Sequence, residues 1–404
     1  MGYQLKVVLK SPVCIAMKKG VGNMIETIDY IPGNTIRGAL AMHYLEEHGT
    51  WDQEKRIYVL PEDNDEFNTI FNSDTMCFHN AYIDGKKVVP LTASSCKYQS
   101  GFEEANNIED FHGVRDTLVE LVKYELTGGF DKDDKDKFDR CGRCPAPMDR
   151  FRGYYGKKSP TASMYETGAV ERRFIARSAL NDTFEAAAAG KLYTIEVIDE
   201  RQTFIAELNK ALFDKLKPLF DEKIIRIGRA KSRGFGEVLI RVEKTIEDNE
   251  HSLSHFFESF NGKMYKFIGD KSFFSVTLLS DVILLDDILR FKSTITINNL
   301  VNTVQDITPE GMAVLNKFKL LRGILSTRIV SEWDHALKLP REDSLSIAKG
   351  SVFVFMSEGL SDSEKELLVT VLGKIENTGI GEQRNKGYGR IRFCDEFHWE
   401  DEVK

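Results

Sequence analysis

The sequence predicts an α+β protein made of two domains, because one order of elements occurs twice along its 404 residues. Each copy has an alternating apolar strand, a helix with apolar residues at helical spacing, a glycine-rich basic loop and a further strand. A chain of this length is long for one domain and lets each of two domains bury its own core. The copies are Leu192–Ile198, Gln202–Phe220 and Ile227–Val242, and then Ser351–Ser357, Ser361–Ile375 and Thr378–Phe393.

Other periodic segments frame these copies. Apolar alternation predicts strands, apolar residues at helical spacing predict a helix, and a polar acidic run predicts a linker. The expected elements are strands at Tyr3–Leu9, Phe273–Leu279 and Val282–Leu285, helices from the Pro32-Gly33 turn to about His48 and at Pro309–Leu321, and a linker at Lys244–Glu250.

Composition narrows the class of protein. The 42% hydrophobic and 29% charged residues are typical of a soluble globular protein. No apolar run reaches the roughly 18 residues of a membrane span, and the N-terminus reads as a strand rather than a signal peptide. We therefore expect a cytoplasmic protein with no membrane partner.

The charge is unevenly distributed along the chain. A net charge of -8 argues against a general nucleic-acid binder. However, residues 140–177 hold nine lysines or arginines against three acids, and residues 223–241 hold six against one. Acidic residues gather at 52–66 and 395–402. One basic surface on an acidic body fits a subunit that holds RNA on one face and contacts proteins through others.

The first glycine-rich loop combines bare backbone with cations. Glycine allows a positive φ and lets a ligand approach the main chain, and amides beside cations suit a phosphate backbone. A dinucleotide fingerprint is excluded, because a strand rather than a helix follows the loop. The alternative is a hairpin with a solvated basic edge. The side chains expected to contact RNA are Arg229, Lys231, Ser232, Arg233 and Phe235.

The second loop, Thr378–Phe393, repeats this pattern and extends the candidate RNA site. Phe235 in the first loop and Tyr388 in the second each lie between glycines, where a ring either stacks on an unpaired base or fills a domain interface. The residues of the second loop expected at the RNA are Arg384, Asn385, Lys386 and Tyr388.

Residues 85–158 lose periodicity, are rich in charge, glycine and proline, and are predicted to be an insertion in the first domain. They contain a Cys3His set suited to a structural zinc ion, because no thioredoxin-like pattern surrounds the CxxC pair. Cys77 is the rival fourth ligand should the histidine serve another purpose. The predicted ligands are Cys96, His112, Cys141 and Cys144.

The strings SRGFGEV and NKGYGRI, each before a strand, resemble the glycine-rich loop of the RAMP superfamily of CRISPR-associated proteins. The string IPGNTIRGAL resembles the motif that follows the first strand in that family. The resemblance implies two ferredoxin-like, RRM-like βαββαβ domains, which we expect at residues 1–245, with the zinc-binding insertion, and at residues 252–404.

The IPGNTIRGAL string opens a helix that Asn34 or Thr35 is expected to cap, and the resemblance implies that Asn34 and Arg37 contact RNA. The local alternative is an ordinary capped helix with a solvated arginine. The segment Met164–Ile198 resembles a loop and strand that lie along the guide in RAMP backbone subunits. It implies RNA contacts by Arg172, Arg173 and Arg177, for which a solvated charge run is the alternative.

The likeness over both halves is to the two-domain RAMP subunit of type III-D effector complexes. It implies a non-catalytic subunit that holds the repeat-derived 5′ tag of a guide RNA in antiviral defence. Its partners would be the guide RNA, RAMP backbone subunits, the large polymerase/cyclase-type subunit and, indirectly, target RNA.

The alternative function is a RAMP-type RNA endonuclease that processes guides or cuts target RNA. A metal-independent nuclease needs a general base, and His43 is the candidate in the first helix. A backbone-type cutter places an aspartate after the first strand, where Asp29 lies. His43 on an apolar stretch and Asp29 beside a turn have structural explanations, so binding without cleavage is our expectation.

Overall fold

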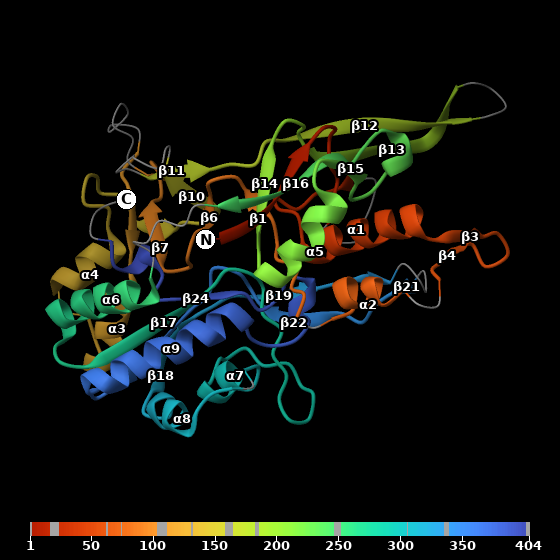
Figure 1. Ribbon diagram of the computed structural model, residues 1–404. Helices are drawn as coiled ribbons and strands as arrows, with labels where there is room; N and C mark the ends of the chain where they lie inside the picture. The colour runs from red at the N-terminus through yellow and green to blue at the C-terminus, as the bar shows by residue number, and fades with distance from the viewer. Residues whose placement is uncertain are drawn as a thin grey trace. The chain divides into compact units, whose positions relative to one another are not determined.

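The computed structural model describes residues 2–16, 24–61, 64–73, 75–102, 111–130, 132–157, 165–181, 186–245, 252–304, 306–334 and 339–400. It is a mixed α+β protein with several small sheets (Figure 1). The chain forms two compact units. The first contains residues 1–84, 169–247 and 385–387, and the second contains residues 85–168, 248–384 and 388–404.

The first unit is built on a five-stranded antiparallel sheet in the order β15-β16-β1-β14-β5. Every second residue of the central strands is buried, as Leu5, Val7 and Leu9 are on β1, because successive side chains point to opposite faces. The strands are β15 (Lys223–Arg226), β16 (Glu237–Thr245), β1 (Gly2–Leu9), β14 (Thr203–Leu208) and β5 (Tyr82–Ile83).

Helices cover this sheet. Helix α5 (Lys210–Phe220) contacts β16 and β1 and buries Leu212 and Leu216, which lie one turn apart. Asn209 begins it by accepting a hydrogen bond from the Leu212 amide at 2.7 Å. Smaller elements of the unit are α1 (Gly33–His48), α2 (Asp65–Phe71), β3 (Thr50–Asp52) and β4 (Ile57–Val59).

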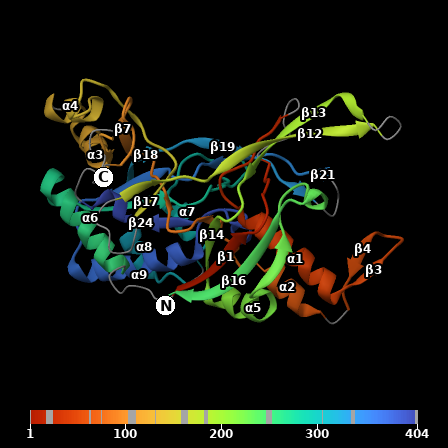
Figure 2. The same ribbon diagram turned by 90° about the horizontal axis from the view of Figure 1, so that it is seen from above.

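A long antiparallel hairpin formed by β12 (Arg172–Asn181) and β13 (Ala186–Ile198) extends away from this sheet in both views (Figures 1 and 2). The short strand β2 (Met24–Ile25) adds to it in parallel. Val13 joins the base of the hairpin through a bridge to Ile198.

The second unit contains a four-stranded sheet in the order β18-β23-β17-β24 with antiparallel pairing throughout. Helix α6 contacts β17, and α9 contacts β24. The strands are β18 (Lys319–Ile324), β23 (Val352–Ser357), β17 (Ser272–Leu278) and β24 (Ile391–Phe393), and the helices are α6 (Leu253–Ile268), α7 (Ile297–Val301), α8 (Pro309–Leu315) and α9 (Asp362–Thr378).

The second unit repeats the hairpin of the first. Strands β19 (Thr327–Val330) and β22 (Ser344–Ile347) pair between β18 and β23 in chain order, as β12 and β13 pair between β5 and β14. Val282 bridges to Ile347 at its base, as Val13 does to Ile198. Strands β20 (Trp333–Asp334) and β21 (Leu339–Pro340) form a further pair.

Residues 85–168 interrupt the first unit along the chain but pack within the second. Leu118, Val119 and Val122 on α3 belong to the same buried cluster as the β17–β23 sheet. The domain boundaries stay a prediction, because compactness does not show which segment folds independently. The segment contains β6 (Lys87–Val88), β7 (Ala93–Cys96), β8 (Val114–Asp116), α3 (Leu118–Thr127), α4 (Lys132–Asp139), β9 (Met148–Arg150), β10 (Tyr154–Lys157) and β11 (Tyr165–Gly168).

Three predicted elements are wrong in part. The helix predicted over Gln202–Phe220 is the strand β14 followed by α5, because Phe204 and Leu208 fit both a helical and an alternating pattern. The helix predicted over Pro309–Leu321 ends at Leu315 and gives way to β18. Val282–Leu285 makes isolated bridges rather than a strand.

The predicted linker Lys244–Glu250 lies mostly outside the described residues, which stop at 245 and resume at 252. Among the helices in the described ranges, none has the length and apolar character needed to span a membrane.

Candidate nucleic-acid interface and metal centre

The first glycine-rich loop is closed by three backbone hydrogen bonds. The Ile227 amide donates to Gly236 O at 2.8 Å, the Gly236 amide to Pro12 O at 2.9 Å, and the Arg229 amide to Cys14 O at 2.8 Å. Between these bonds the chain makes one 3-10 turn, η1 (Lys231–Arg233). The loop is therefore anchored to the segment that follows β1.

The second loop has the same backbone bonds. The Ile380 amide donates to Gly389 O, the Gly389 amide to Asp281 O and the Glu382 amide to Ile283 O, each at 2.9 Å. A 3-10 turn, η2 (Arg384–Lys386), again lies between them. The two loops thus repeat one another bond by bond, and each is tied to the segment after the first strand of its sheet. We call this arrangement the loop cage.

The cage requires glycine because backbone atoms meet where a side chain would be. A Cβ on Gly236 would lie 2.0 Å from Ile227 O, and one on Gly389 would lie 2.0 Å from Ile380 O. Both residues also have positive φ, of 85° and 79°. A residue with a side chain would be strained by its φ and would collide with the carbonyl oxygen of Ile227 or Ile380 across the loop.

The first loop presents cations to solvent. Arg229 and Arg233 are exposed, and Ser232 lies between them. Burial lowers the pKa of Lys231, and the Glu46 carboxylate opposes that shift. Within the described part of the chain, Arg229, Lys231 and Arg233 form no ion pair. Their charge is therefore available to an anion.

The hairpin β12/β13 meets the first loop through Arg177, which the sequence predicts at the RNA, and through Tyr193, which it does not. Arg177 and Tyr193 lie opposite each other in the hairpin. The Arg177 guanidinium lies 5.3 Å from the centre of the Phe235 ring, and that of Arg233 lies 5.9 Å from the centre of the Tyr193 ring. Arg233 Nη1 also donates to the Tyr193 hydroxyl. The loop and the hairpin thus form one surface of the first unit.

Two of the three hairpin arginines predicted at the RNA, Arg172 and Arg173, are ion-paired. Arg172 lies 3.3 Å from the Glu196 carboxylate. Arg173 lies 2.8 Å from Asp199 and 3.0 Å from Glu200. These pairs are partly exposed, so an RNA phosphate would compete with the carboxylates for each guanidinium.

The aromatic residues between the glycines differ in exposure. Phe235 is only 4% exposed and packs with Cys14, Ile195 and Val197, so its ring fills the core of the first unit. Burial in this cluster raises the pKa of the Cys14 thiol to about 11. Tyr388 in the second loop is half-buried. Neither interpretation left open for Phe235 describes this position, because a buried ring presents no face to a base and its neighbours all belong to the first unit rather than to a domain interface.

The start of α1 differs from the prediction. The cap residue is Pro32 rather than Asn34 or Thr35, and it makes no side-chain cap. Instead, Asn80 Oδ1 accepts from the Gly33 amide at 2.9 Å. A buried asparagine from a distant segment can fill this role because Gly33 lacks the Cβ that would lie 1.8 Å from Phe78 O.

Arg37 lies on α1 but faces another helix. Its Nε donates to Phe71 O at 2.7 Å, and Nη2 donates to Asn72 Oδ1 at 3.3 Å, at the end of α2. Asn34 accepts a hydrogen bond from the Thr35 hydroxyl at 3.4 Å. Arg37 therefore satisfies carbonyls at a helix C-terminus, which gives it a structural role beside the predicted RNA contact.

The tip of the second loop packs against this same region. Residues 385–387 belong to the first unit, and Asn385 O accepts from the Phe78 amide at 3.4 Å. A Cβ on Gly387 would lie 2.7 Å from Asn80 Oδ1. Arg384 donates to Thr378 O at 3.2 Å, and Lys386 is half-buried. The start of α1 and the tip of the second loop, which the sequence predicts as separate RNA contacts, thus lie together in the first unit.

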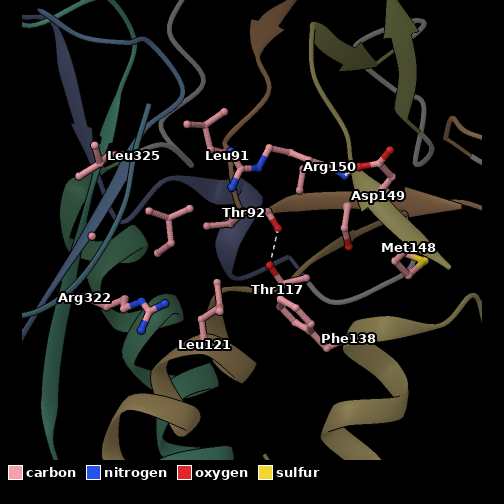
Figure 3. Close-up of a pocket in the computed structure, with 14 residues that line it drawn as sticks. Leu91, Thr92, Thr117, Leu121, Phe138, Met148, Asp149, Arg150, Arg322 and Leu325 are labelled. Atoms are coloured by element: carbon pink, nitrogen blue, oxygen red, sulfur yellow. Dashed lines mark hydrogen bonds between the residues drawn. The ribbon is translucent and has the colours of Figure 1, made fainter. Parts of the chain in front are cut away.

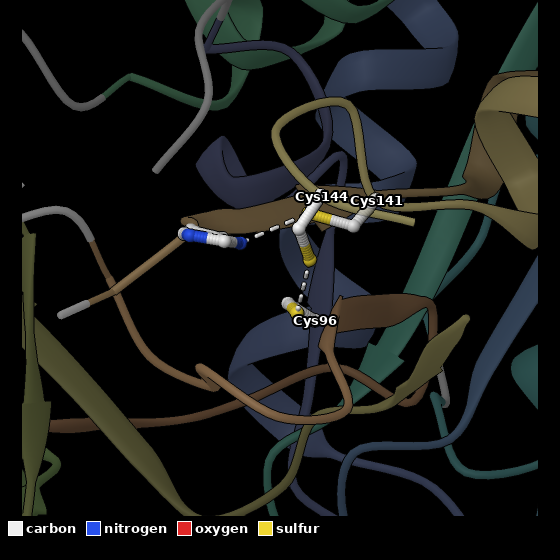
Figure 4. Close-up of side chains that lie close together, drawn as sticks. Cys96, Cys141 and Cys144 are labelled. Atoms are coloured by element: carbon white, nitrogen blue, oxygen red, sulfur yellow. Dashed lines mark hydrogen bonds between the residues drawn. The ribbon is translucent and has the colours of Figure 1, made fainter. Parts of the chain in front are cut away.

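A cluster of three cysteines and one histidine forms a candidate metal centre in the second unit (Figure 4). The ligand atoms of Cys96, His112, Cys141 and Cys144 all lie within 4.8 Å of one another. Cys96 Sγ is 3.6 Å from Cys144 Sγ, and His112 Nδ1 is 3.2 Å from Cys141 Sγ. Cys77 belongs to the first unit and is not part of the cluster.

Backbone amides prepare two of these thiols for a metal ion. Burial acts to raise the pKa of Cys96, but amides of Gln99 and Tyr98 outweigh it and lower the pKa. The Arg143 and Cys144 amides likewise lower the pKa of Cys141 against the effect of burial. Donors that stabilise thiolates favour binding of a cation, because the thiolate is the metal ligand.

The two candidate catalytic residues, His43 and Asp29, are both partly buried in the first unit. His43 Nε2 lies 3.3 Å from the Glu47 carboxylate, one helical turn away, and its ring lies 6.1 Å from the Phe220 ring. Asp29 is half-buried in the turn before Ile31.

Comparison with known proteins identifies the family. Residues 7–238, more than half of the chain, match the family model described as RAMP superfamily. The chain therefore belongs to the RAMP superfamily. Among curated proteins, the search finds no match.

Several solved structures are similar to this chain. A chain of the type III-B Cmr-beta bound to cognate target RNA and AMPPnP is 11% identical, with a TM-score of 0.38 over 92% of this chain and 94% of that chain. Thermus thermophilus Cas6 is 10% identical, with a TM-score of 0.29 over 76% of this chain and 97% of that chain. Cmr4 is 11% identical, with a TM-score of 0.24 over 61% of this chain and 100% of that chain.

The loop cage predicts a large difference between two neighbouring glycines. Gly234 and Gly236 share a φ of 85°, but a Cβ on Gly234 would meet no described atom within 4 Å. Gly236→Ala should lower the free energy of unfolding by about 3 kcal/mol or more, because it adds a collision to the φ strain. Gly234→Ala should cost only about 1 kcal/mol. Urea unfolding of both variants measures the difference, and equal costs would contradict a cage that depends on close backbone contact.

Proposed function

We propose that this chain is a non-catalytic RNA-binding subunit of a type III CRISPR effector complex, of the type III-D kind, and that it holds the repeat-derived 5′ tag of the guide RNA. The observation that carries the proposal is the repeated loop cage, which in the first unit presents Arg229 and Arg233 without ion pairs to any described residue. Membership of the RAMP superfamily supports it. The proposed partners are the guide RNA, RAMP backbone subunits and the large polymerase/cyclase-type subunit, with target RNA contacted indirectly.

The topology supports a fold of two ferredoxin-like domains. Numbered in chain order, the four strands β1, β5, β14 and β16 take the spatial order 4-1-3-2, with helices after the first and the third. The strands β17, β18, β23 and β24 take the same order. Both sheets are antiparallel, as a βαββαβ unit requires.

The surroundings of the candidate catalytic residues support binding rather than cleavage. A general base must reach the hydroxyl from which it takes a proton. The His43 Nε2 atom is buried 3.3 Å from the Glu47 carboxylate, on the helix that packs near Phe220, so an RNA hydroxyl does not reach it. The alternative function, an RNA endonuclease that uses His43 or Asp29, is tested by the same binding experiment described below.

We also propose that the cysteine-histidine cluster binds one structural zinc ion. Three thiolates and one imidazole are a common tetrahedral zinc set, with Zn–S distances of about 2.3 Å. Tetrahedral geometry at that distance places sulfur atoms about 3.8 Å apart, and Cys96 Sγ and Cys144 Sγ are 3.6 Å apart. The ion would add a link between β7 and the turn between α4 and β9, which also meet where β7 pairs with β9.

The proposal predicts how RNA binding depends on salt. Replacing Arg229, Lys231 and Arg233 with alanine should weaken binding of single-stranded RNA of any sequence. It should also reduce the slope of log K against log salt by roughly 0.7 for each lost phosphate contact. Fluorescence anisotropy at several salt concentrations measures both quantities.

The matched control is Lys210, Lys215 and Lys217 replaced with alanine on α5, which removes the same charge elsewhere in the first unit. It should leave the slope nearly unchanged. An equal loss in both variants would mean that net charge alone is responsible. Unchanged affinity in the loop variant would refute the RNA-binding role of the loop. Cleavage of the RNA that His43→Ala or Asp29→Ala abolishes while binding persists would establish the nuclease instead.

The zinc proposal predicts about one zinc ion per chain by elemental analysis after metal-replete expression. Cys144→Ser should reduce the zinc content to below about half and lower the midpoint of thermal unfolding, because structural zinc binding contributes folding free energy. Cys77→Ser should change neither, since Cys77 lies outside the cluster. Loss of zinc in Cys77→Ser together with retention in His112→Ala would assign the fourth ligand to Cys77.

A further inference from the structure

The second unit contains a cavity of about 470 Å³ that neither the loop cage nor the metal cluster uses. Its walls come from β7, β9, α3, α4 and β18, all elements of this unit. Ligand pockets for small molecules are typically about 300 to 1,000 Å³. A single nucleotide is a ligand of this size class. Strands β7 and β9 pair through Cys96 and Met148 beside the metal cluster, which fixes one wall of the cavity.

Two guanidinium groups give the cavity a preference for anions. Figure 3 shows Arg150 and Arg322 extending toward the space from different walls. Arg322 Nη1 lies 2.6 Å from Glu125 Oε2, which leaves its other nitrogens to face a ligand. The guanidinium fork matches the oxygens of a phosphate group better than an ammonium does. Asp149 lies beside Arg150 at the rim and accepts the Arg150 amide at 2.8 Å.

Buried hydroxyls in the wall add a second requirement. Thr117 Oγ1 donates to Thr92 O at 2.7 Å (Figure 3). In contrast, Thr92 Oγ1 and Ser94 Oγ are buried and have no hydrogen-bond partner among the described atoms. Burying a hydroxyl without a partner costs free energy, because its hydrogen bonds to water are lost. A ligand with its own donors and acceptors would remove that cost.

The rest of the wall is apolar. Leu121, Phe138, Ile324 and Leu325 supply aliphatic surface and one aromatic ring. An aromatic ring and aliphatic groups suit the flat face of a nucleobase, whereas an inorganic anion would leave them unused. The guanidinium groups match a phosphate, the buried hydroxyls match the donors and acceptors of a sugar or base edge, and the apolar side chains match a planar ring.

We propose that this cavity binds a nucleoside monophosphate, supplied either as a free nucleotide or as the phosphorylated end of an RNA. The cations take the phosphate, the buried hydroxyls take polar groups of the sugar or base, and the apolar wall takes the base. This site goes beyond the proposed function, because it shares no residue with the loop cage.

The test is isothermal titration of the full chain with adenosine 5′-monophosphate, adenosine and inorganic phosphate. Adenosine 5′-monophosphate should bind more tightly than either part. Arg150→Ala should weaken it by roughly tenfold, because a charge-assisted hydrogen bond is lost. Arg152→Ala removes the same charge just outside the cavity and should have little effect. Thr92→Val keeps the shape of the side chain and removes the unpaired hydroxyl, so it should weaken binding several-fold without lowering the thermal unfolding midpoint.

Competition by a short RNA with a 5′-phosphate, compared with the same RNA carrying a 5′-hydroxyl, identifies the source of the ligand. Competition by the phosphorylated RNA alone assigns the site to an RNA end, and no competition by either assigns it to a free nucleotide. The proposal is overturned if adenosine 5′-monophosphate does not bind saturably below about 1 mM, or binds no more tightly than phosphate. Equal loss in Arg150→Ala and Arg152→Ala, or unchanged affinity in Thr92→Val, also contradicts it. Because the loop variant keeps this cavity, failure here is distinguishable from failure of the RNA-binding proposal.

Discussion

The contact of backbone with backbone at Gly236 and Gly389 is the constraint on which both candidate RNA loops depend. In each loop the amide and the carbonyl of the glycine are both hydrogen-bonded, and the carbonyl oxygen of Ile227 or Ile380 lies where a Cβ would be. The cage fixes a 3-10 turn in each loop, and within the described ranges the cations of the first turn, Lys231 and Arg233, form no ion pair. A loop fixed in this way binds an anion without a large ordering cost, because its conformation exists before binding.

Charge placement explains how an acidic protein can hold RNA. With a net charge of -8, the chain as a whole repels a polyanion at long range. The ion pairs of Arg172 and Arg173 satisfy those cations within the hairpin, whereas the cations of the first loop form no such pair within the described ranges. The protein therefore offers a short strip of available positive charge, which favours a defined segment of RNA over general binding along a duplex.

Part of this architecture could be predicted from the sequence and part could not. The loops could be predicted because only glycine fits where backbone atoms meet so closely. The cluster of Cys96, His112, Cys141 and Cys144 could be predicted because these residue types are zinc ligands. Strand β14 was not predicted, because the spacing of Phe204 and Leu208 fits both a helix and an alternating strand. The roles of Asn80 and Tyr193 depend on contacts between segments far apart in the chain, and no local pattern contains them.

The central claim is that each of the two loop cages contacts RNA. The most direct measurement is crosslinking of a guide-like RNA containing 4-thiouridine to the full chain, with the crosslinked peptides identified by mass spectrometry. The account predicts crosslinks concentrated in residues 226–241 and 379–392 and in the hairpin strands β12 and β13. Crosslinks confined to other segments, with these peptides unmodified, would contradict it.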